Sequence, residues 1–202
     1  MKKALFAAVA LAAASISGAA SAGEVFVAAL KHDVTFIGDT LGVGTAGREG
    51  GVDLQLGVRS ERIDALSAIG RPSVHALVSF NTDDTSNFVA AGFNWPLDIG
   101  GEGGFYIRPG LGLAYTDGET DLPPVNAPGI SQAEVQRRLT LYNTRIDFGS
   151  KVLFEPEFSL GYKLTGATSV ELTYMHLSNG QIFHKGKNQG LDDVGLRVNV
   201  KF

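Results

Sequence analysis

Cysteine is absent from this 202-residue chain, and long apolar runs are almost absent. Without cysteine the chain can have neither a disulfide framework nor a thiolate metal site. After residue 22, no stretch approaches the roughly 18 consecutive apolar residues of a membrane-spanning helix, so no such helix is expected. Basic residues are in the minority, with 17 Lys and Arg against 21 Asp and Glu. This balance argues against nucleic acid as a partner, because nucleic acid selects a basic face.

The longest apolar run lies at the N-terminus and is typical of a secretory signal peptide. Lys2 and Lys3 precede an apolar stretch from Ala4 to Ile16, and small residues follow up to Ala22. This stretch is too short to span a bilayer, and its end resembles a signal-peptidase site. We expect residues 1–22 to be removed, which leaves 180 residues (202 minus 22), enough for one domain. The loss of two lysines takes the formal net charge from −4 to −6.

Strict alternation of apolar and polar residues dominates the remaining chain. Between Val52 and Arg59, for example, every second residue is apolar, and Asp53 and Gln55 lie between them. Such a period of two indicates strands whose two faces meet different surroundings. The 26 glycines suit a β protein with tight turns. The alternation predicts about eight strands, near residues 25–36, 51–60, 73–80, 87–97, 104–116, 148–164, 168–178 and 191–202.

The polar face of these strands decides between a soluble β protein and a membrane barrel. It is rich in charges, at Arg59, Arg108, Glu155, Glu157, Lys163, Arg197 and Lys201. A soluble sandwich would turn its apolar face inward, whereas charges mixed with glycine are typical of a narrow, side-chain-filled lumen inside an apolar outer belt. Aromatic residues fall near the ends of the runs, and the chain ends on Phe202. We therefore predict that residues 23–202 form an all-β, eight-stranded, antiparallel, up-and-down transmembrane barrel in the outer membrane, with a soluble lipocalin-like barrel as the alternative.

The loops fit this topology. With both ends of the barrel chain in the periplasm, the longest loop, residues 117–145, falls outside the cell, as external loops of such barrels do. Within it, Ser131 and Glu134 form a capping-box pattern that predicts one or two helical turns. Residues 62–70 are a second candidate for a short helical turn. Eight strands leave no aqueous pore, so a porin is not expected.

Three groups of residues resemble functional motifs but are better explained structurally. Residues 42–47 fit the G-x-G-x-x-G fingerprint, but a strand follows where that fingerprint requires a helix. His32, His75 and His184 have no metal-ligand spacing, and His75 is expected to be hydrogen-bonded in the lumen. We therefore expect no cofactor and no metal. Glu155 and Glu157 are interpreted as members of an internal ion-pair network with Arg108, Arg197 and Lys163.

One constellation points to chemistry. In the seventh predicted strand, His176 and Ser178 share the face of Val170, Leu172 and Tyr174, which is the face expected to meet lipid. Burying a polar side chain in lipid costs free energy, so a His and a Ser on that face suggest a functional role. Residues at i and i+2 of a strand lie about 6.6 Å apart, which allows an imidazole to reach a hydroxyl, as in the nucleophile–base pair of a hydrolase.

The third member of such a triad would be a carboxylate on the neighbouring strand. In the eighth predicted strand, Val194 and Leu196 point outward, and the same parity turns Asp192 outward and Asp193 inward. Asp192 is therefore the predicted acid. From the pattern alone, simple interfacial placement of His176 and Ser178 is an equally good explanation.

The motif His176-Leu177-Ser178-Asn179, followed by Asn188-Gln189-Gly190-Leu191-Asp192, resembles the PagL family of lipid A 3-O-deacylases. Members of this family are eight-stranded outer-membrane barrels with a His-x-Ser-Asn motif and a later Asn-x-Gly-x-Glu. The resemblance implies Ser178 as nucleophile, His176 as base and Asp192 as acid, with Asn179 and Gly180 in the region that stabilises the oxyanion. The implied substrate is the ester-linked 3-hydroxyacyl chain at position 3 of lipid A, and no metal is implied.

Two departures from the family pattern concern the acid. Asp192 stands where the family has Glu, and the connecting loop is about two residues longer. The alternatives to a deacylase are a non-catalytic structural or adhesion barrel and an outer-membrane phospholipase. The expected partners are lipopolysaccharide and the surrounding membrane lipid, and the pattern leaves open whether the barrel forms a homodimer.

Overall fold

The computed structural model describes residues 23–42, 46–99 and 104–202. The signal peptide expected at residues 1–22 and the centre of the glycine-rich stretch 42–47 lie outside these ranges. The strands are β1 (Glu24–Lys31), β2 (Val52–Arg59), β3 (Ser73–Asn81), β4 (Phe88–Asn94), β5 (Leu97–Asp98), β6 (Phe105–Thr116), β7 (Val152–Lys163), β8 (Thr168–Leu177) and β9 (Leu191–Lys201).

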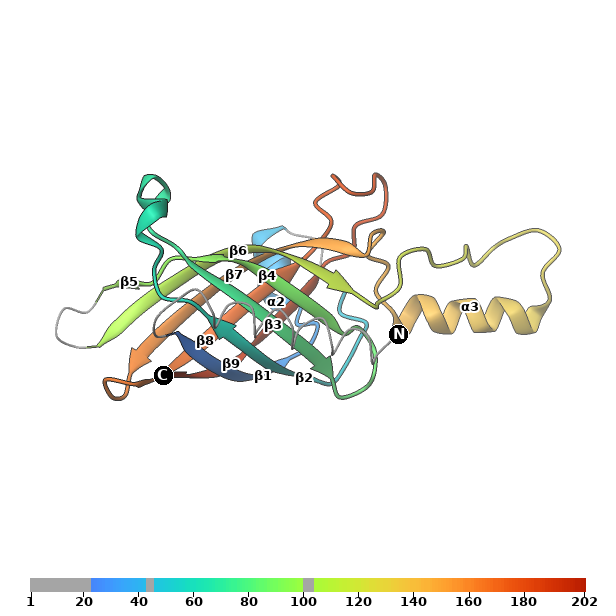
Figure 1. Ribbon diagram of the computed structural model, residues 1–202. Helices are drawn as coiled ribbons and strands as arrows, with labels where there is room; N and C mark the ends of the chain where they lie inside the picture. The colour runs from blue at the N-terminus through green and yellow to red at the C-terminus, as the bar shows by residue number, and fades with distance from the viewer. Residues whose placement is uncertain (1–22, 43–45, 100–103) are drawn as a thin grey trace.

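Eight long strands close into a single barrel (Figure 1). Their order is β4-β3-β2-β1-β9-β8-β7-β6, and β4 pairs again with β6 to complete the ring. All of these pairs are antiparallel, and chain neighbours lie side by side, so the predicted up-and-down barrel is confirmed. The two-residue β5 also pairs with β6 and extends the line of β4 beyond Trp95 and Pro96.

The two ends of the barrel differ. At one end, here called the termini end, Glu24 pairs with Lys201. At the other, here called the loop end, the chain forms the helix α3 (Gln132–Thr144), which projects away from the barrel (Figure 1). This arrangement brings the long loop between β6 and β7 to the end opposite Glu24 and Lys201, as expected from the topology.

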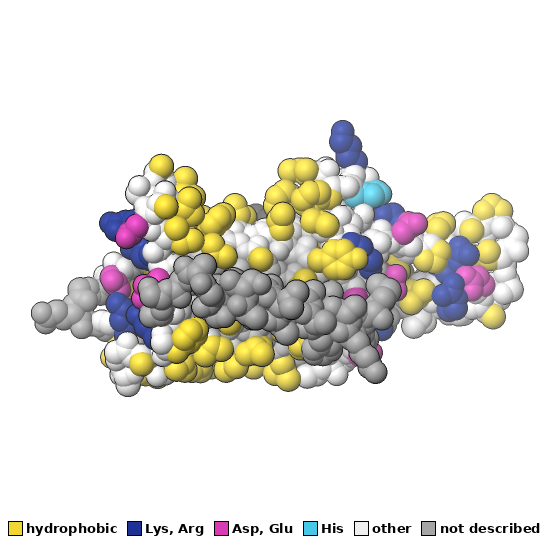
Figure 2. All heavy atoms as spheres, viewed as in Figure 1, with side chains coloured by type: hydrophobic (Ala, Val, Ile, Leu, Met, Phe, Trp, Pro, Cys, Tyr) yellow, Lys and Arg dark blue, Asp and Glu magenta, His cyan; other side chains and the backbone are white. Residues whose placement is uncertain are grey.

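The alternation seen in the sequence separates an outer wall from an inner one. In β9, Leu196 is 58% exposed, whereas the next residue, Arg197, is fully buried. Figure 2 shows hydrophobic side chains over the outer wall of the barrel and charged side chains gathered towards its two ends. An apolar outer belt around a charged interior is what a lipid bilayer requires of a membrane barrel. Among the described residues, no helix combines the length and the apolar character needed to cross a bilayer.

The lumen is filled by an ion-pair network, as predicted. Arg197 donates from both Nη atoms to Glu157 at 3.0 Å, and its guanidinium also stacks 4.5 Å from the ring centroid of Phe26. His75 Nε2 lies 3.1 Å from a carboxylate oxygen of Glu155. Further pairs join Arg108 to Glu24 and Glu171, and Arg59 to Glu24. The charges thus neutralise one another inside the barrel.

One lumen prediction was wrong. Lys163 does not join the internal network; its ammonium lies 2.5 Å from Asp98 at the exposed termini end. The residue is the last of β7, so its long side chain reaches past the rim towards solvent, where the charge keeps its hydration.

Glycines opposite the lumen carboxylates make this network possible. Gly110 and Gly112 of β6 are the register partners of Glu157 and Glu155 of β7. A Cβ atom added at Gly112 would lie 2.3 Å from a Glu155 carboxylate oxygen and 2.6 Å from the Ala91 carbonyl oxygen. The carboxylates therefore occupy the space that side chains on β6 would otherwise fill.

Removing the charge of Glu157 is expected to destabilise the barrel without touching catalysis. Glu157→Gln leaves the buried Arg197 guanidinium without its main partner, and breaking a buried ion pair in this way costs about 3 kcal/mol or more. Urea unfolding in detergent micelles measures the loss, and Glu61→Gln, an exposed position, is the matched control. Unchanged stability combined with lost enzyme activity would show that the inside–outside assignment is wrong.

The helices correct the sequence predictions in detail. The first strand, expected to reach residue 36, ends at Lys31, and the short helix α2 (Phe36–Leu41) follows. The predicted turn at residues 62–70 is the 3-10 helix η1 (Asp64–Ile69). The capping prediction is confirmed because the Ser131 hydroxyl accepts the Glu134 N–H, but α3 has 13 residues rather than one or two turns.

The extra length of α3 has a local cause. The Glu134 carboxylate, instead of returning to the Ser131 N–H, accepts hydrogen bonds from Arg137 and Arg138 one turn later. These hydrogen bonds lower the pKa of Glu134 to about 2. Acid–base pairs at this spacing favour an isolated helix, although each contributes only a few tenths of a kcal/mol.

Candidate active site

The candidate site lies where β8 ends and β9 begins, at the loop end of the barrel. The register pairs His176 of β8 directly with Asp192 of β9. Directly opposed residues of an antiparallel pair point to the same face of the sheet, so both side chains belong to the outer wall. Asp193 lies on the inner wall, where its carboxylate accepts the Asp33 N–H. The parity inferred from the sequence therefore holds for both aspartates.

The imidazole and the Asp192 carboxylate are in direct contact. His176 Nδ1 lies 2.5 Å from Asp192 Oδ1, and the Tyr174 hydroxyl donates to the same oxygen at 3.1 Å. Asp192 is fully buried, and the His176 side chain is only 11% exposed. A carboxylate on Nδ1 keeps the proton on that nitrogen, so Nε2 is left as the proton acceptor. This is the arrangement that a general base needs.

Ser178 comes directly after Leu177, the last residue of β8. It forms a β-bridge with Phe154 of β7, whose N–H donates to the Ser178 carbonyl at 2.7 Å. Because Phe154 belongs to the outer wall, the bridge gives Ser178 the same face as His176. Among the described contacts, none joins the Ser178 hydroxyl to the imidazole. Catalytic hydrogen bonds are often long before substrate binds, so this geometry is compatible with a nucleophile–base pair.

Asn179 is a structural residue in this geometry. Its side-chain amide donates to the carbonyl oxygens of Phe148 and Lys187, at 2.5 and 2.6 Å, and its own oxygen accepts the Gln181 N–H. Its backbone N–H donates to Asn188 Oδ1 at 2.8 Å. Every polar group that could point at an oxyanion therefore has a partner within the protein. The amide instead ties the loop after β8 to the segment before β7.

Two neighbouring groups have donors that are not engaged within the described part of the chain. Gly180 has a φ of +60°, and its N–H makes no hydrogen bond among the described residues. The Asn188 side chain accepts the Asn179 N–H through its oxygen, which leaves its NH₂ group without an acceptor in the described part of the chain. Sequence reasoning quoted Asn188 only as part of a motif. The sequence signal for a role is its position four residues before Asp192. Its hydrogen bond with the Asn179 N–H brings this part of the loop back beside Ser178.

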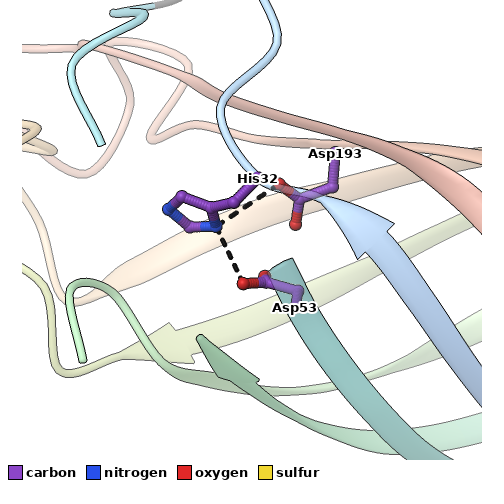
Figure 3. Close-up of side chains that lie close together, drawn as sticks. All are labelled: His32, Asp53 and Asp193. Atoms are coloured by element: carbon purple, nitrogen blue, oxygen red, sulfur yellow. Dashed lines mark ion pairs between the residues drawn. The ribbon is translucent and has the colours of Figure 1, made fainter. Parts of the chain in front are cut away.

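Metal-ligating groups gather elsewhere. Of the residues that the structure describes, only His32, Asp53 and Asp193 bring three such groups together, on the inner side of the barrel (Figure 3). The outer site consists of a hydroxyl, an imidazole and one carboxylate. That set is suited to hydrolysis by nucleophilic attack rather than to holding an ion.

Comparison with known proteins agrees with the geometry. The family model for lipid A 3-O-deacylase (PagL) matches residues 51–201, about three quarters of the chain. The chain belongs to the PagL family. This assignment confirms the resemblance inferred from the His176 and Asp192 motifs. The chain is an outer-membrane β-barrel enzyme, a lipid A deacylase, which excludes the non-catalytic structural or adhesion barrel.

One solved structure supports the fold, and two others are more distantly similar. A crystal structure of the outer-membrane enzyme PagL aligns with a TM-score of 0.53 and 16% identity, covering 88% of this chain and 98% of that one. The crystal structure of neisserial surface protein A has a TM-score of 0.48 and 11% identity, covering 90% and 96%. A de novo designed transmembrane β-barrel has a TM-score of 0.46 and 11% identity, covering 91% and 97%. No curated protein sequence matches this chain significantly.

Proposed function

We propose that this PagL-family barrel hydrolyses the ester at position 3 of lipid A and releases its 3-hydroxyacyl chain through a Ser178–His176–Asp192 triad. The observation that carries the proposal is the 2.5 Å contact between His176 Nδ1 and Asp192 Oδ1 on the outer wall. A buried carboxylate behind an imidazole on a lipid-facing surface is costly unless it is used. The deacylase family gives the reaction class, and the family pattern supports the choice of the 3-position.

The reaction has two halves. In the first, the Ser178 oxygen attacks the acyl carbonyl while His176 Nε2 takes the hydroxyl proton. The bond from the carbonyl carbon to the sugar oxygen then breaks, and the imidazolium returns its proton to that oxygen. In the second half, water attacks the acyl-serine while His176 takes its proton. The bond from the carbonyl carbon to Ser178 Oγ breaks, the imidazolium returns the proton to Oγ, and the fatty acid leaves. Asp192 stabilises the imidazolium in both halves.

The negative charge on the carbonyl oxygen needs donors near Ser178. The Gly180 N–H and the Asn188 amide are proposed for this role because both lie within the loop that follows the serine, and neither has another acceptor among the residues that the structure describes. Preorganised donors of this kind typically contribute 10² to 10³ in rate, or roughly 3–4 kcal/mol. In this proposal Asn179 supports the site by holding the loop.

The surroundings of Ser178 suit an acyl chain. Phe154, its bridge partner, stacks on Phe183 at 5.0 Å between ring centroids, and Ile182 beside it is 71% exposed. These apolar side chains form a surface continuous with the lipid belt of the barrel. A substrate already in the outer leaflet can therefore reach the serine laterally, without a pocket inside the barrel.

Mass spectrometry of lipid A after incubation with the purified barrel tests the proposal. We expect the loss of one 3-hydroxyacyl mass, and fragmentation should assign the loss to position 3 rather than 3′. Glycerophospholipid in the same micelles serves as the competing ester. Release of glycerophospholipid fatty acid with lipid A intact would identify a phospholipase and contradict the proposal.

A further inference from the structure

A second polar cluster lies inside the barrel, directly behind the candidate active site. His32 comes directly after β1, Asp53 lies on β2, and Asp193 lies on β9 (Figure 3). β1 pairs with both of these strands, and Lys31 is opposite Val52 on one side and Val194 on the other. The register therefore brings one imidazole and two carboxylates to the same height of the lumen. All three side chains are at most 1% exposed.

The imidazole points into the gap between the two carboxylates. His32 Nδ1 lies 2.9 Å from Asp53 Oδ1 and 3.5 Å from Asp193 Oδ1. Despite these short distances, Nδ1 has no hydrogen bond of acceptable geometry, and neither has Asp193 Oδ2. Two buried polar atoms of one cluster are thus left without a hydrogen bond, and an ion bound between the three side chains would satisfy both.

The hydrogen-bond partners around the cluster are of the kind that support metal ligands. Glu49 lies 3.1 Å from His32 Nε2, so its carboxylate can hold the proton on that nitrogen and leave Nδ1 free to coordinate. Asp53 accepts hydrogen bonds from Asn81 and Ser79, at 2.9 and 3.1 Å. A carboxylate behind a coordinating histidine, with coordinating carboxylates themselves hydrogen-bonded, is the usual second shell of a metal site.

We propose that His32, Asp53 and Asp193 bind a divalent transition-metal ion, Zn²⁺ above all, as a structural site of the barrel. The ligand atoms lie within 4.8 Å of one another. Tetrahedral zinc, with bonds of about 2.0–2.2 Å, places ligand atoms roughly 3.3–3.5 Å apart. The 3.5 Å distance from His32 Nδ1 to Asp193 already fits this spacing. The 2.9 Å distance from His32 Nδ1 to Asp53 must increase by a few tenths of an ångström.

Ligand type and charge decide which ion fits. An imidazole nitrogen with two carboxylates suits Zn²⁺ or Mn²⁺, whereas Mg²⁺ and Ca²⁺ prefer oxygen ligands only. Glu49, Asp53 and Asp193 bring three carboxyl groups around a single imidazole, so the cluster carries a buried excess of negative charge when all three are ionised. A divalent ion offsets more of this excess than the one proton of an imidazolium does.

The site would also fix the strand that carries the proposed catalytic acid. Asp193 points inward and its neighbour Asp192 points outward, so an ion on Asp193 restrains β9 directly behind His176. The segment after β1, which carries His32, is also held to β9 by the Val34 N–H, which donates to the Asp192 carbonyl at 2.8 Å. This consequence for catalysis depends on the proposed function, whereas metal binding itself does not.

The test measures metal directly. Because the ligands are buried, the full-length mature barrel without an affinity tag is refolded into detergent with Zn²⁺, desalted, and analysed for bound metal. We expect one zinc per folded chain, no retained Mg²⁺ or Ca²⁺, and a higher unfolding temperature than after refolding with a chelator. X-ray absorption of the zinc-loaded protein should show a shell of nitrogen and oxygen only, at about 2.0–2.2 Å.

Variants separate this site from other histidines. His32→Asn and Asp53→Asn should each weaken zinc binding by at least about 10-fold and remove the thermal shift. His75→Asn, at another buried imidazole paired with a carboxylate, and His184→Asn, at an exposed loop, should keep the full zinc content. A zinc-free wild-type barrel, or equal zinc in His32→Asn and the two controls, overturns the proposal. If a ligand variant fails to fold, the X-ray absorption spectrum of the zinc-loaded wild type tests the proposal by itself. A zinc shell without imidazole would also contradict the proposal.

Discussion

Ser178→Ala is expected to abolish release of the 3-hydroxy fatty acid from lipid A while leaving a folded barrel. The substitution removes the atom that forms the acyl-enzyme, and loss of a triad nucleophile typically costs about 10⁴-fold or more in turnover. Ser178 contributes backbone hydrogen bonds to Phe154, which alanine keeps. Time courses of lipid A mass spectra measure the loss, and heat-modifiable mobility on a gel shows that the barrel is intact.

His176→Ala should have an effect of similar size, and the double variant should be little worse than either single one. The two residues act as one unit, because the serine is a weak nucleophile until a base takes its proton. Ser159→Ala is the matched control, since this serine lies on the inner face of β7 and bonds Thr173 at 2.9 Å. Near wild-type turnover in Ser178→Ala would eliminate the triad, and full additivity in the double variant would show that the two residues act separately.

The barrel could be predicted from the sequence because lipid and lumen impose opposite demands on alternate residues. Leu196 and Arg197 differ by one position and lie on opposite walls, and this parity carried through to Asp192 and Asp193. The same rule placed Glu155 and Glu157 in an internal ion-pair network, and in the structure Glu157 pairs with Arg197 and Glu155 with His75. It failed for Lys163, because alternation gives the face of a residue but not where a long side chain ends near the rim.

The loop contacts could not be predicted in the same way. Asn179 follows the proposed nucleophile, and its motif suggested a place near the oxyanion, yet its amide is bound to the Phe148 and Lys187 carbonyls. Phe148 lies 31 residues from Asn179 in the chain, and the two meet only because β7 begins at the end of the barrel where β8 ends. The cluster at His32 was missed for the same reason, since side chains from β2, from β9 and from the segment after β1 leave no spacing signal in the sequence.

Asp192→Asn is expected to reduce turnover severely, by up to roughly 10⁴-fold. The carboxylate holds the proton on His176 Nδ1 from 2.5 Å, and it stabilises the imidazolium that forms when Ser178 loses its proton. An amide in its place can present its NH₂ group to the ring, which favours the wrong tautomer and offers no charge. Asp64→Asn, an exposed carboxylate at the termini end paired with Arg71, is the matched control.

Asp192→Glu is the sharper variant because it restores the residue of the family pattern. Asp192 Oδ1 also accepts the Tyr174 hydroxyl at 3.1 Å, so the longer side chain must keep the imidazole as partner while the tyrosine contact adjusts. We expect Asp192→Glu to retain substantial activity and Asp192→Asn to retain almost none. An active Asp192→Asn variant would show that serine and histidine work as a dyad. Equal loss in both variants, with a folded barrel, would mean that position 192 holds the strand register and does not orient the imidazole.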